Sequence, residues 1–280
     1  MDNKELKELK ITATKIRKNI VDTVYNAQSG HPGGSLSCAD ILTVLYFKQM
    51  RINEKNPKWE DRDRFVLSKG HCSPALYSTL AQRGFFPIED LKTFRKSDSY
   101  LEGHPNMKYV PGVDMSTGSL GQGISVACGM ALAGKIDKKD YRVYSILGDG
   151  EIEEGQVWEA LMSASHYKLD NLTIFLDYNG LQIDGEIAKV MSPNPVVEKF
   201  EAFGLNVIQI DGNDIEQIDE AINKAKEVKG KPTIIVAKTT KGKGVSFMEN
   251  QAGWHGKAPN EEQRDIAISE LNNILSALEE

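Results

Sequence analysis

Cysteine is scarce in this 280-residue sequence, a net positive charge and long apolar runs are lacking, and each shortage excludes a class of protein. The three cysteines, Cys38, Cys72 and Cys128, include no Cys-x-x-Cys pair, which argues against a disulfide framework and a structural zinc site. The net charge of -6 offers no basic surface to a phosphate backbone, so we expect no nucleic-acid partner. No run of about 18 apolar residues is present and the first residues are charged, which predicts no membrane contact, no signal peptide and a cytoplasmic protein.

Apolar runs of strand length alternate with amphipathic segments of helix length along the chain. This alternation predicts an α/β fold, a doubly wound parallel sheet with helices on both faces. No repeat or linker divides the sequence, so we expect one domain over residues 1–280, with an N-terminal helix and a C-terminal helical extension. The expected strands are 64–68, 141–147, 171–179, 206–211 and 232–239, and the main helices are 4–27, 35–47 (capped by Ser35 or Ser37), 72–84, 154–168, 214–228 and 260–279.

Residues suited to binding and catalysis follow these expected strands. His71 comes after the first strand, Asp149 after the second, Asn179 after the third, and the segment 241–255 after the last. Because parallel α/β sheets bind ligands at the carboxyl ends of their strands, we expect these loops to meet at one site. A Gly/Ser/Thr loop at 116–123 leads into a helix rich in small residues and offers backbone N–H groups to an anion.

Two polar turns, Gly148-Asp149-Gly150 and Asn179-Gly180, end neighbouring strands of an expected βαβ unit. Each alone is an ordinary turn sequence. Together they supply carboxylate, amide and carbonyl oxygens, which are ligands for Mg²⁺ or Ca²⁺. Mg²⁺ usually keeps phosphate oxygens in its shell, and glycines allow the backbone to approach them, so the pair indicates a metal-diphosphate site.

These turns and their flanking blocks resemble the transketolase family. GDGEIEEGQ, followed about thirty residues later by DYNGLQIDG, is similar to the thiamine diphosphate signature, and the resemblance runs from about residue 10 to residue 260 in the family's order. It implies transfer of a two-carbon ketol unit from a ketose phosphate to an aldose phosphate. The other blocks that carry it are SGHPGGSLSCADIL, SKGHCSPALYSTL, EGHPN, STGSLGQGISVACGMALAGK and KTTKGKGVSFMENQAGWHG.

The resemblance implies a cofactor site made of thiamine diphosphate and Mg²⁺ or Ca²⁺. The implied metal ligands are the side chains of Asp149 and Asn179 and the carbonyl of Leu181. The implied cofactor-binding residues are His71, Gly118, Leu120, Gly150, Glu154, Asn179, Ile183 and His255.

Three histidines carry the implied catalytic roles near the sugar. The resemblance places His31 and His104 where they reach the sugar hydroxyls, and it adds His255. Histidine exchanges protons near neutral pH, which suits this task. The glutamates Glu151 and Glu153, beside Glu154, are expected to form a solvated helix start favoured by the helix dipole.

The second, pyrimidine-binding domain of full-length transketolases has no counterpart in these residues. The glutamate and the phosphate-binding Arg and His residues that the family carries there are absent as well. The resemblance therefore implies the N-terminal subunit of a split transketolase, which needs a separate C-terminal subunit. An α2β2 assembly is expected, because the family's sites lie at dimer interfaces. Alone, the chain is expected to bind cofactor weakly and to turn over no sugar.

Other functions remain open at this stage. Another thiamine enzyme, such as a 1-deoxyxylulose-phosphate synthase or a 2-oxoacid dehydrogenase subunit, would share the signature, although the spaced histidines favour a polyhydroxylated sugar. A Mg²⁺-dependent phosphatase of the haloacid dehalogenase type is disfavoured because its Asp-x-Asp nucleophile should follow a strand, whereas Asp61 and Asp63 precede one. A non-catalytic cofactor-binding scaffold would not need His31 and His104 together.

Overall fold

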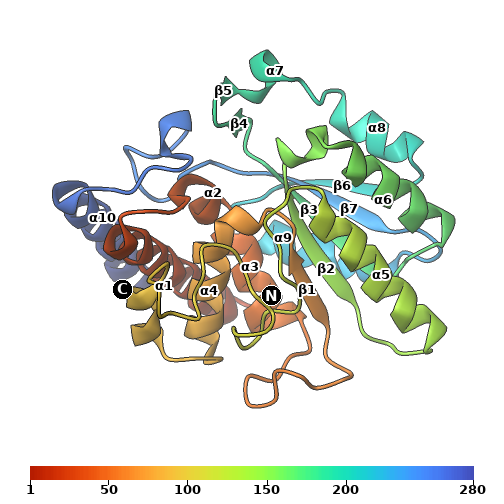
Figure 1. Ribbon diagram of the computed structural model, residues 1–280, viewed down its shortest axis with the longest axis horizontal. Helices are drawn as coiled ribbons and strands as arrows, with labels where there is room; N and C mark the ends of the chain where they lie inside the picture. Colours follow the sequence, from red (N-terminus) through yellow and green to blue (C-terminus); the bar gives the residue numbers. More distant parts are fainter.

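The computed structural model describes all 280 residues and centres on one parallel sheet (Figure 1). Its parallel arrangement and its five strands confirm the predicted fold class. Gly148 pairs with Asp177 and Asp177 with Ala237, so the carboxyl ends of the three central strands lie level with one another. The strand order is β1 (Arg64–Leu67), β2 (Val143–Gly148), β3 (Leu172–Tyr178), β7 (Thr233–Lys238) and β6 (Asn206–Asp211).

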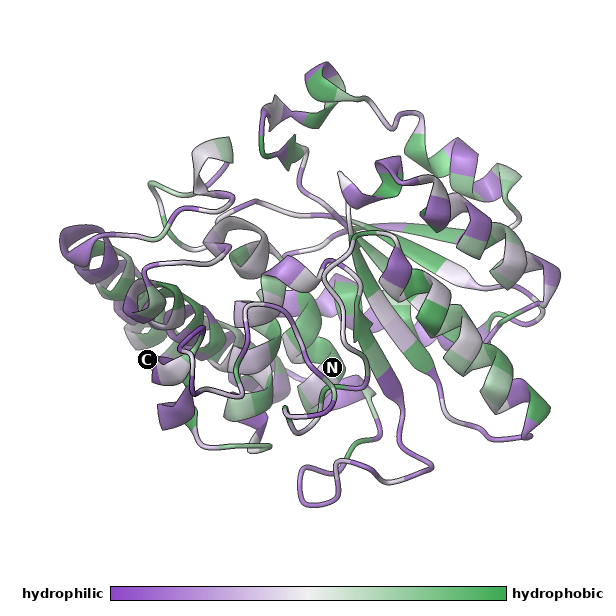
Figure 2. Cartoon of the chain, viewed as in Figure 1, coloured by the Kyte–Doolittle hydropathy of each residue, from purple (hydrophilic) through white to green (hydrophobic).

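Helices cover both faces of this sheet, and most of its strand residues are apolar (Figure 2). Alternate residues of β2 enter two separate cores: Tyr144 and Ile146 join one, and Val143 and Leu147 join the other. This alternation follows from the two-residue period of a strand. The first core is completed by α1 (Asn3–Ala27), α3 (Ala39–Val44), α4 (Ser73–Arg83), α9 (Ile215–Glu227) and α10 (Glu261–Glu279), and the second by α5 (Gln122–Ile136), α6 (Gly155–His166) and α8 (Val196–Ala202).

The helix expected at 35–47 starts earlier and is broken into pieces, so the expected caps were wrong. It begins as α2 (Pro32–Ser37), with His31 at the N-cap and proline in the first turn, where its missing N–H costs nothing. The Ser35 hydroxyl donates to the His31 carbonyl at 2.7 Å, and the Ser37 hydroxyl donates to Asp177 at 2.6 Å. After α3 the chain continues as a π-helix, η1 (Leu45–Gln49).

Short elements fill the remaining loops. An antiparallel pair, β4 (Leu181–Gln182) and β5 (Gly185–Glu186), stands apart from the main sheet and leads into α7 (Ile187–Val190). None of the helices has both the length and the apolar character that crossing a membrane requires. Short 3-10 segments are η2 (Gly70–Cys72), η3 (Ile88–Thr93), η4 (Glu151–Glu153) and η5 (Ala252–Trp254).

The connections at the carboxyl edge diverge, and this divergence creates space for a site. After β1 and β7 the chain runs to the face of the sheet that carries the first core, where Cys72 and Val245 are buried. After β2 and β3 it runs to the opposite face, where Ile152 and Val196 are buried in the second core. In open α/β sheets, ligands bind in the crevice where neighbouring strands send their connections to opposite faces. A binding site is therefore expected at the carboxyl ends of β1, β2, β3 and β7.

Candidate active site

A cavity of about 290 Å³ lies in this crevice and collects most of the residues singled out from the sequence. A larger, open groove of about 940 Å³ lies beyond it along β6 and α8, but no histidine lines that groove. The predicted residues that line the smaller cavity are His31, His71, Gly118, Leu120, Asp149, Gly150, Asn179, Leu181, Ile183 and His255. Gly148 of the predicted turn also lines it, and five further lining residues were not predicted for the site: Gly34, Lys69, Glu151, Gln182 and Lys241.

Asp149 ties the two polar turns together. Its side chain is buried, and its two carboxylate oxygens accept hydrogen bonds from Gly150 N at 2.9 Å and from Gly180 N at 2.6 Å. The Asn179 side-chain oxygen accepts from Leu181 N at 3.1 Å. Burial, together with the nearby Asp177 carboxylate, raises the pKa of Asp149 to about 6. A cation beside this carboxylate would lower its pKa and stabilise the anion.

Lys241 reaches the same turn from the loop after β7. Its Nζ donates to the Leu181 carbonyl at 2.9 Å and lies 3.1 Å from His255 Nδ1. The side chain is buried, and burial lowers the pKa of its ammonium group. The sequence indicated only that the segment 241–255 follows a strand end, and Lys241 itself was missed.

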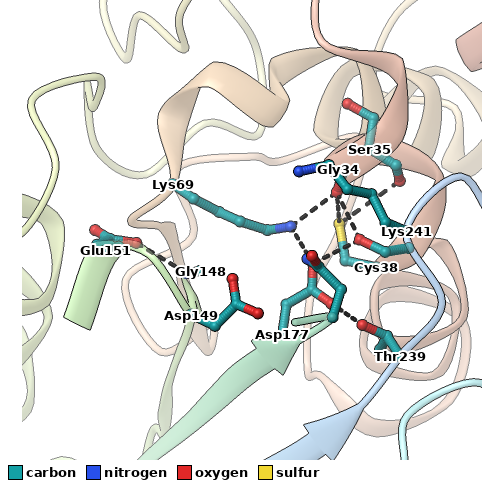
Figure 3. A network of polar contacts seen from close by, with 12 residues as sticks. Gly34, Ser35, Cys38, Lys69, Gly148, Asp149, Glu151, Asp177, Thr239 and Lys241 are labelled. Atoms are coloured by element: carbon teal, nitrogen blue, oxygen red, sulfur yellow. Dashed lines mark hydrogen bonds and ion pairs between the residues drawn. The ribbon is translucent and has the colours of Figure 1, made fainter. Parts of the chain in front are cut away.

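A buried ion pair, shown in Figure 3, lies at the wall of the cavity, which Lys69 lines. Lys69 Nζ lies 2.5 Å from the carboxylate of Asp177 and donates to the Gly34 carbonyl at 2.8 Å. The hydroxyls of Ser37 and Thr239 also donate to Asp177. Burial alone would lower the pKa of Lys69, but Asp177 reverses this effect and holds the pKa well above its usual range. This pair joins the ends of β1, β3 and β7 to the start of α2.

Three histidines meet at one side of the cavity. The ring centroids of His31, His71 and His255 are 5.1 to 5.4 Å apart. Burial, followed by neighbouring histidines and lysines, lowers the pKa of His31 and His71 to about 4 and that of His255 to about 3. All three rings are therefore neutral at pH 7, so each has one nitrogen that donates and one that accepts. His31 Nδ1 is buried without a hydrogen-bond partner in the protein.

The predicted residues His104 and Glu154 do not line the cavity. Both are exposed. His104 lies against Gly118, where an added Cβ would come within 3.0 Å of the imidazole ring, and Glu154 is the N-cap of α6 beside Gly121. The structure thus places both next to the loop that lines the cavity.

Glu151 corrects the interpretation of the acidic cluster. Glu153 and Glu154 are exposed, as expected of a solvated helix start, but Glu151 is only 2% exposed. Its Oε1 accepts from Ser68 Oγ at 2.5 Å and from Gly121 N at 2.9 Å, and its Oε2 accepts from Gly148 N at 3.1 Å. The sequence GDGEIEEG contains no periodic pattern that would show which of its three glutamates is buried. Glu151 points inward because the chain forms the short 3-10 turn η4 at this position.

The donor groups of this cavity fit a metal-diphosphate. No three His, Cys, Asp or Glu side chains cluster as metal ligands, so a cation here would draw on Asp149, Asn179, the Leu181 carbonyl and oxygens of a bound anion. These are the hard oxygen ligands that Mg²⁺ and Ca²⁺ prefer. Lys69 is already paired with Asp177, but Lys241 forms no ion pair and adds positive charge, which favours a diphosphate over a neutral ligand.

Comparison with known proteins agrees with this chemistry. Residues 9–271 match the family model described as transketolase, thiamine diphosphate binding domain. The chain belongs to the transketolase family. It is 44% identical over 275 residues to one of the subunits of the apulose-4-phosphate transketolase of Phocaeicola vulgatus, covering 98% of both chains. It is 46% identical to the 6-deoxy-6-sulfo-D-fructose transketolase subunit SqwG of a Clostridium species, covering 94% of this chain and 96% of that one.

Other transketolases match this chain over less than half of their own length. Human transketolase is 43% identical over 99% of this chain but only 44% of its own. Among solved structures, a transketolase of Pichia stipitis superposes with a TM-score of 0.89 at 35% identity, covering 96% of this chain and 43% of that one. The transketolase of Campylobacter jejuni superposes with a TM-score of 0.86 at 36% identity, covering all of this chain and 47% of that one. These neighbours share the fold of this chain.

Proposed function

We propose that this chain is the N-terminal subunit of a thiamine diphosphate-dependent transketolase and transfers a two-carbon ketol unit between sugar phosphates. The observation that carries the proposal is the convergence of Asp149, Asn179 and three neutral histidines on one cavity at the carboxyl edge of the sheet. When bound, thiamine diphosphate supplies the electron sink for breaking a carbon–carbon bond. The chain's own residues bind and orient it, exclude water and move protons.

Each predicted residue has a role in this proposal. Asp149, Asn179 and the Leu181 carbonyl hold the metal, for which we propose Mg²⁺. His31, His104 and His255 donate protons to, or accept them from, the sugar hydroxyls, and the first and last of these line the cavity. The cofactor is bound by the remaining predicted residues: His71, Gly118, Leu120, Gly150, Glu154 and Ile183. Asn179 contacts the cofactor as well as the metal, and His255 contacts the cofactor as well as the sugar.

We propose that a separate C-terminal subunit completes each site. Two relatives that match this chain over nearly their whole length are named as transketolase subunits, which supports a two-chain enzyme. We also propose an α2β2 assembly, because symmetric dimers are the commonest oligomers, and a cytoplasmic location for it. Pentose phosphates are the default substrates, and the names of the relatives support testing modified sugars as well.

The test is a coupled assay of xylulose 5-phosphate with ribose 5-phosphate, with thiamine diphosphate and Mg²⁺ present. The chain is assayed alone and after co-expression with its neighbouring gene product. Activity is expected only in the pair, and Asp149→Ala is expected to lower it at least about a hundredfold, because the metal loses its carboxylate ligand. His166→Ala is the matched control, since His166 is exposed on α6 and lines no part of the cavity.

Different outcomes separate the alternatives. Turnover of pyruvate rather than of a ketose donor would assign the chain to another class of thiamine enzyme. Cofactor binding by a stable complex that turns over no phosphorylated, apulose-type or sulfonated ketose would leave a scaffold and refute the proposed transferase.

A further inference from the structure

Glu151 is a buried carboxylate that joins three segments around the cavity. Ser68, at the end of β1, and Gly121, before α5, donate to one of its oxygens, and Gly148, at the end of β2, donates to the other. Three donors on one carboxylate satisfy most of its acceptor capacity without a counter-charge. Glu151 also lines the cavity, so it forms part of the cavity wall and is bonded to three other segments of that wall.

Each of these segments carries residues of the proposed cofactor site. Ser68 precedes Lys69 and His71 by one and three residues, Gly121 follows Leu120, and Gly148 precedes Asp149. The start of α5 also packs closely on β1, because a Cβ at Gly123 would come within 2.7 Å of Ser68 Cα. Movement of any one segment therefore requires a hydrogen bond to Glu151 to lengthen or break.

We propose that Glu151 is a positioning residue that sets the spacing between the loop at 118–121 and the two strand ends that hold the metal and diphosphate. The inference rests on the proposed function. Thiamine diphosphate is a long ligand with a ring system at one end and a charged group at the other. A protein that holds both ends gains affinity when the two binding segments are fixed in advance. Glu151 provides this fixation through its neighbours.

The substitution Glu151→Gln distinguishes positioning from simple space filling. The amide has nearly the same shape, and its oxygen can still accept from Ser68 and Gly121. Its NH₂ group would face the N–H of Gly148, however, so two donors would oppose each other and that contact would be lost. We expect the dissociation constant for thiamine diphosphate to rise about tenfold, with kcat at saturating cofactor within about threefold of the original.

The experiment uses the two-subunit complex in Mg²⁺ and measures thiamine diphosphate binding by calorimetry, with kcat and the cofactor's apparent KM measured separately. Glu159→Gln is the matched control, because it makes the same change at an exposed position of α6. Ser68→Ala is the second variant, which keeps the carboxylate, removes one donor and is expected to weaken binding about threefold.

Two results would overturn the proposal. One is an unchanged dissociation constant in both Glu151→Gln and Ser68→Ala. The other is a loss of kcat that saturating cofactor does not restore, together with a lowered melting temperature, which would show a merely structural role. The calorimetric comparison does not depend on sugar turnover. An inactive parent complex would therefore refute the proposed function while the binding data still tested Glu151.

Discussion

At the scale of single residues, the buried pair Lys69 and Asp177 gives the sharpest prediction. Breaking a buried ion pair by removing one partner leaves an uncompensated charge and costs about 3–5 kcal/mol. Lys69→Met should lower the free energy of unfolding by about this amount, because Asp177 would keep only its hydroxyl donors from Ser37 and Thr239. Urea denaturation followed by far-UV circular dichroism measures the change.

The double variant Lys69→Met with Asp177→Asn is the control for this prediction. It removes the orphaned charge, so it should recover part of the lost stability and give a positive coupling energy in the double-mutant cycle. A single variant that costs less than about 1 kcal/mol, the range of an exposed pair, would contradict the buried geometry.

The sequence predicted which polar residues lie close together where they follow an expected strand or stand in a glycine-containing loop. Asp149, Asn179, His31 and His71 stand in glycine-containing turns after strands or before a helix, and they meet at the cavity as expected. Lys69 stands two residues before the predicted His71 in the sequence and was still missed. Burial of a lysine depends on a partner from β3, which is distant in sequence, and no local pattern encodes that contact.

At the scale of elements, α10 is more than a surface extension. It packs along α1, and its residues Ala267 and Leu271 are fully buried in the first core. Its N-terminus carries a capping box formed by Asn260 and Gln263. Polar and charged residues together dominate the rest of the helix, so the sequence predicted no more than a helical extension. The helical period predicted that the helix exists, but it could not identify the helix against which its narrow apolar stripe would pack.

Leu271→Ala tests this packing. Deleting a buried leucine removes apolar contacts and leaves a cavity, which costs about 2–5 kcal/mol. We expect the melting temperature of the variant to fall, because the cavity would open between α10 and the loop at Gly244. Ile274→Ala on the same helix is the control, since Ile274 is 40% exposed and its loss should change stability by about 0.5 kcal/mol or less. Equal effects of the two substitutions would refute the packing described here.

At the scale of the whole molecule, the two cores and the sheet were predictable because their signals are periodic and repeated. Five apolar runs each contribute one strand, and an error of one or two residues at an end changes nothing in the topology. The irregular start of α2 shows the limit of this reasoning. His31 and the loop after β7 share a cavity only because their flanking elements send the chain to the same face, and that arrangement is a property of the complete fold.

The shape of the cavity also predicts how cofactor binding depends on the partner. At about 290 Å³ it lies at the lower limit of ordinary small-molecule sites, and Ile183 at its edge is 68% exposed. The isolated chain should therefore enclose only part of thiamine diphosphate. Calorimetric titration in Mg²⁺ should give a dissociation constant at least about tenfold weaker for the chain alone than for the two-subunit complex, because the partner would bury the exposed remainder. Mass action then requires that saturating cofactor raise the melting temperature of the complex more than that of the chain alone. Equal affinities would mean that this chain already contains the whole cofactor site, and the proposed division of the site between two subunits would be wrong.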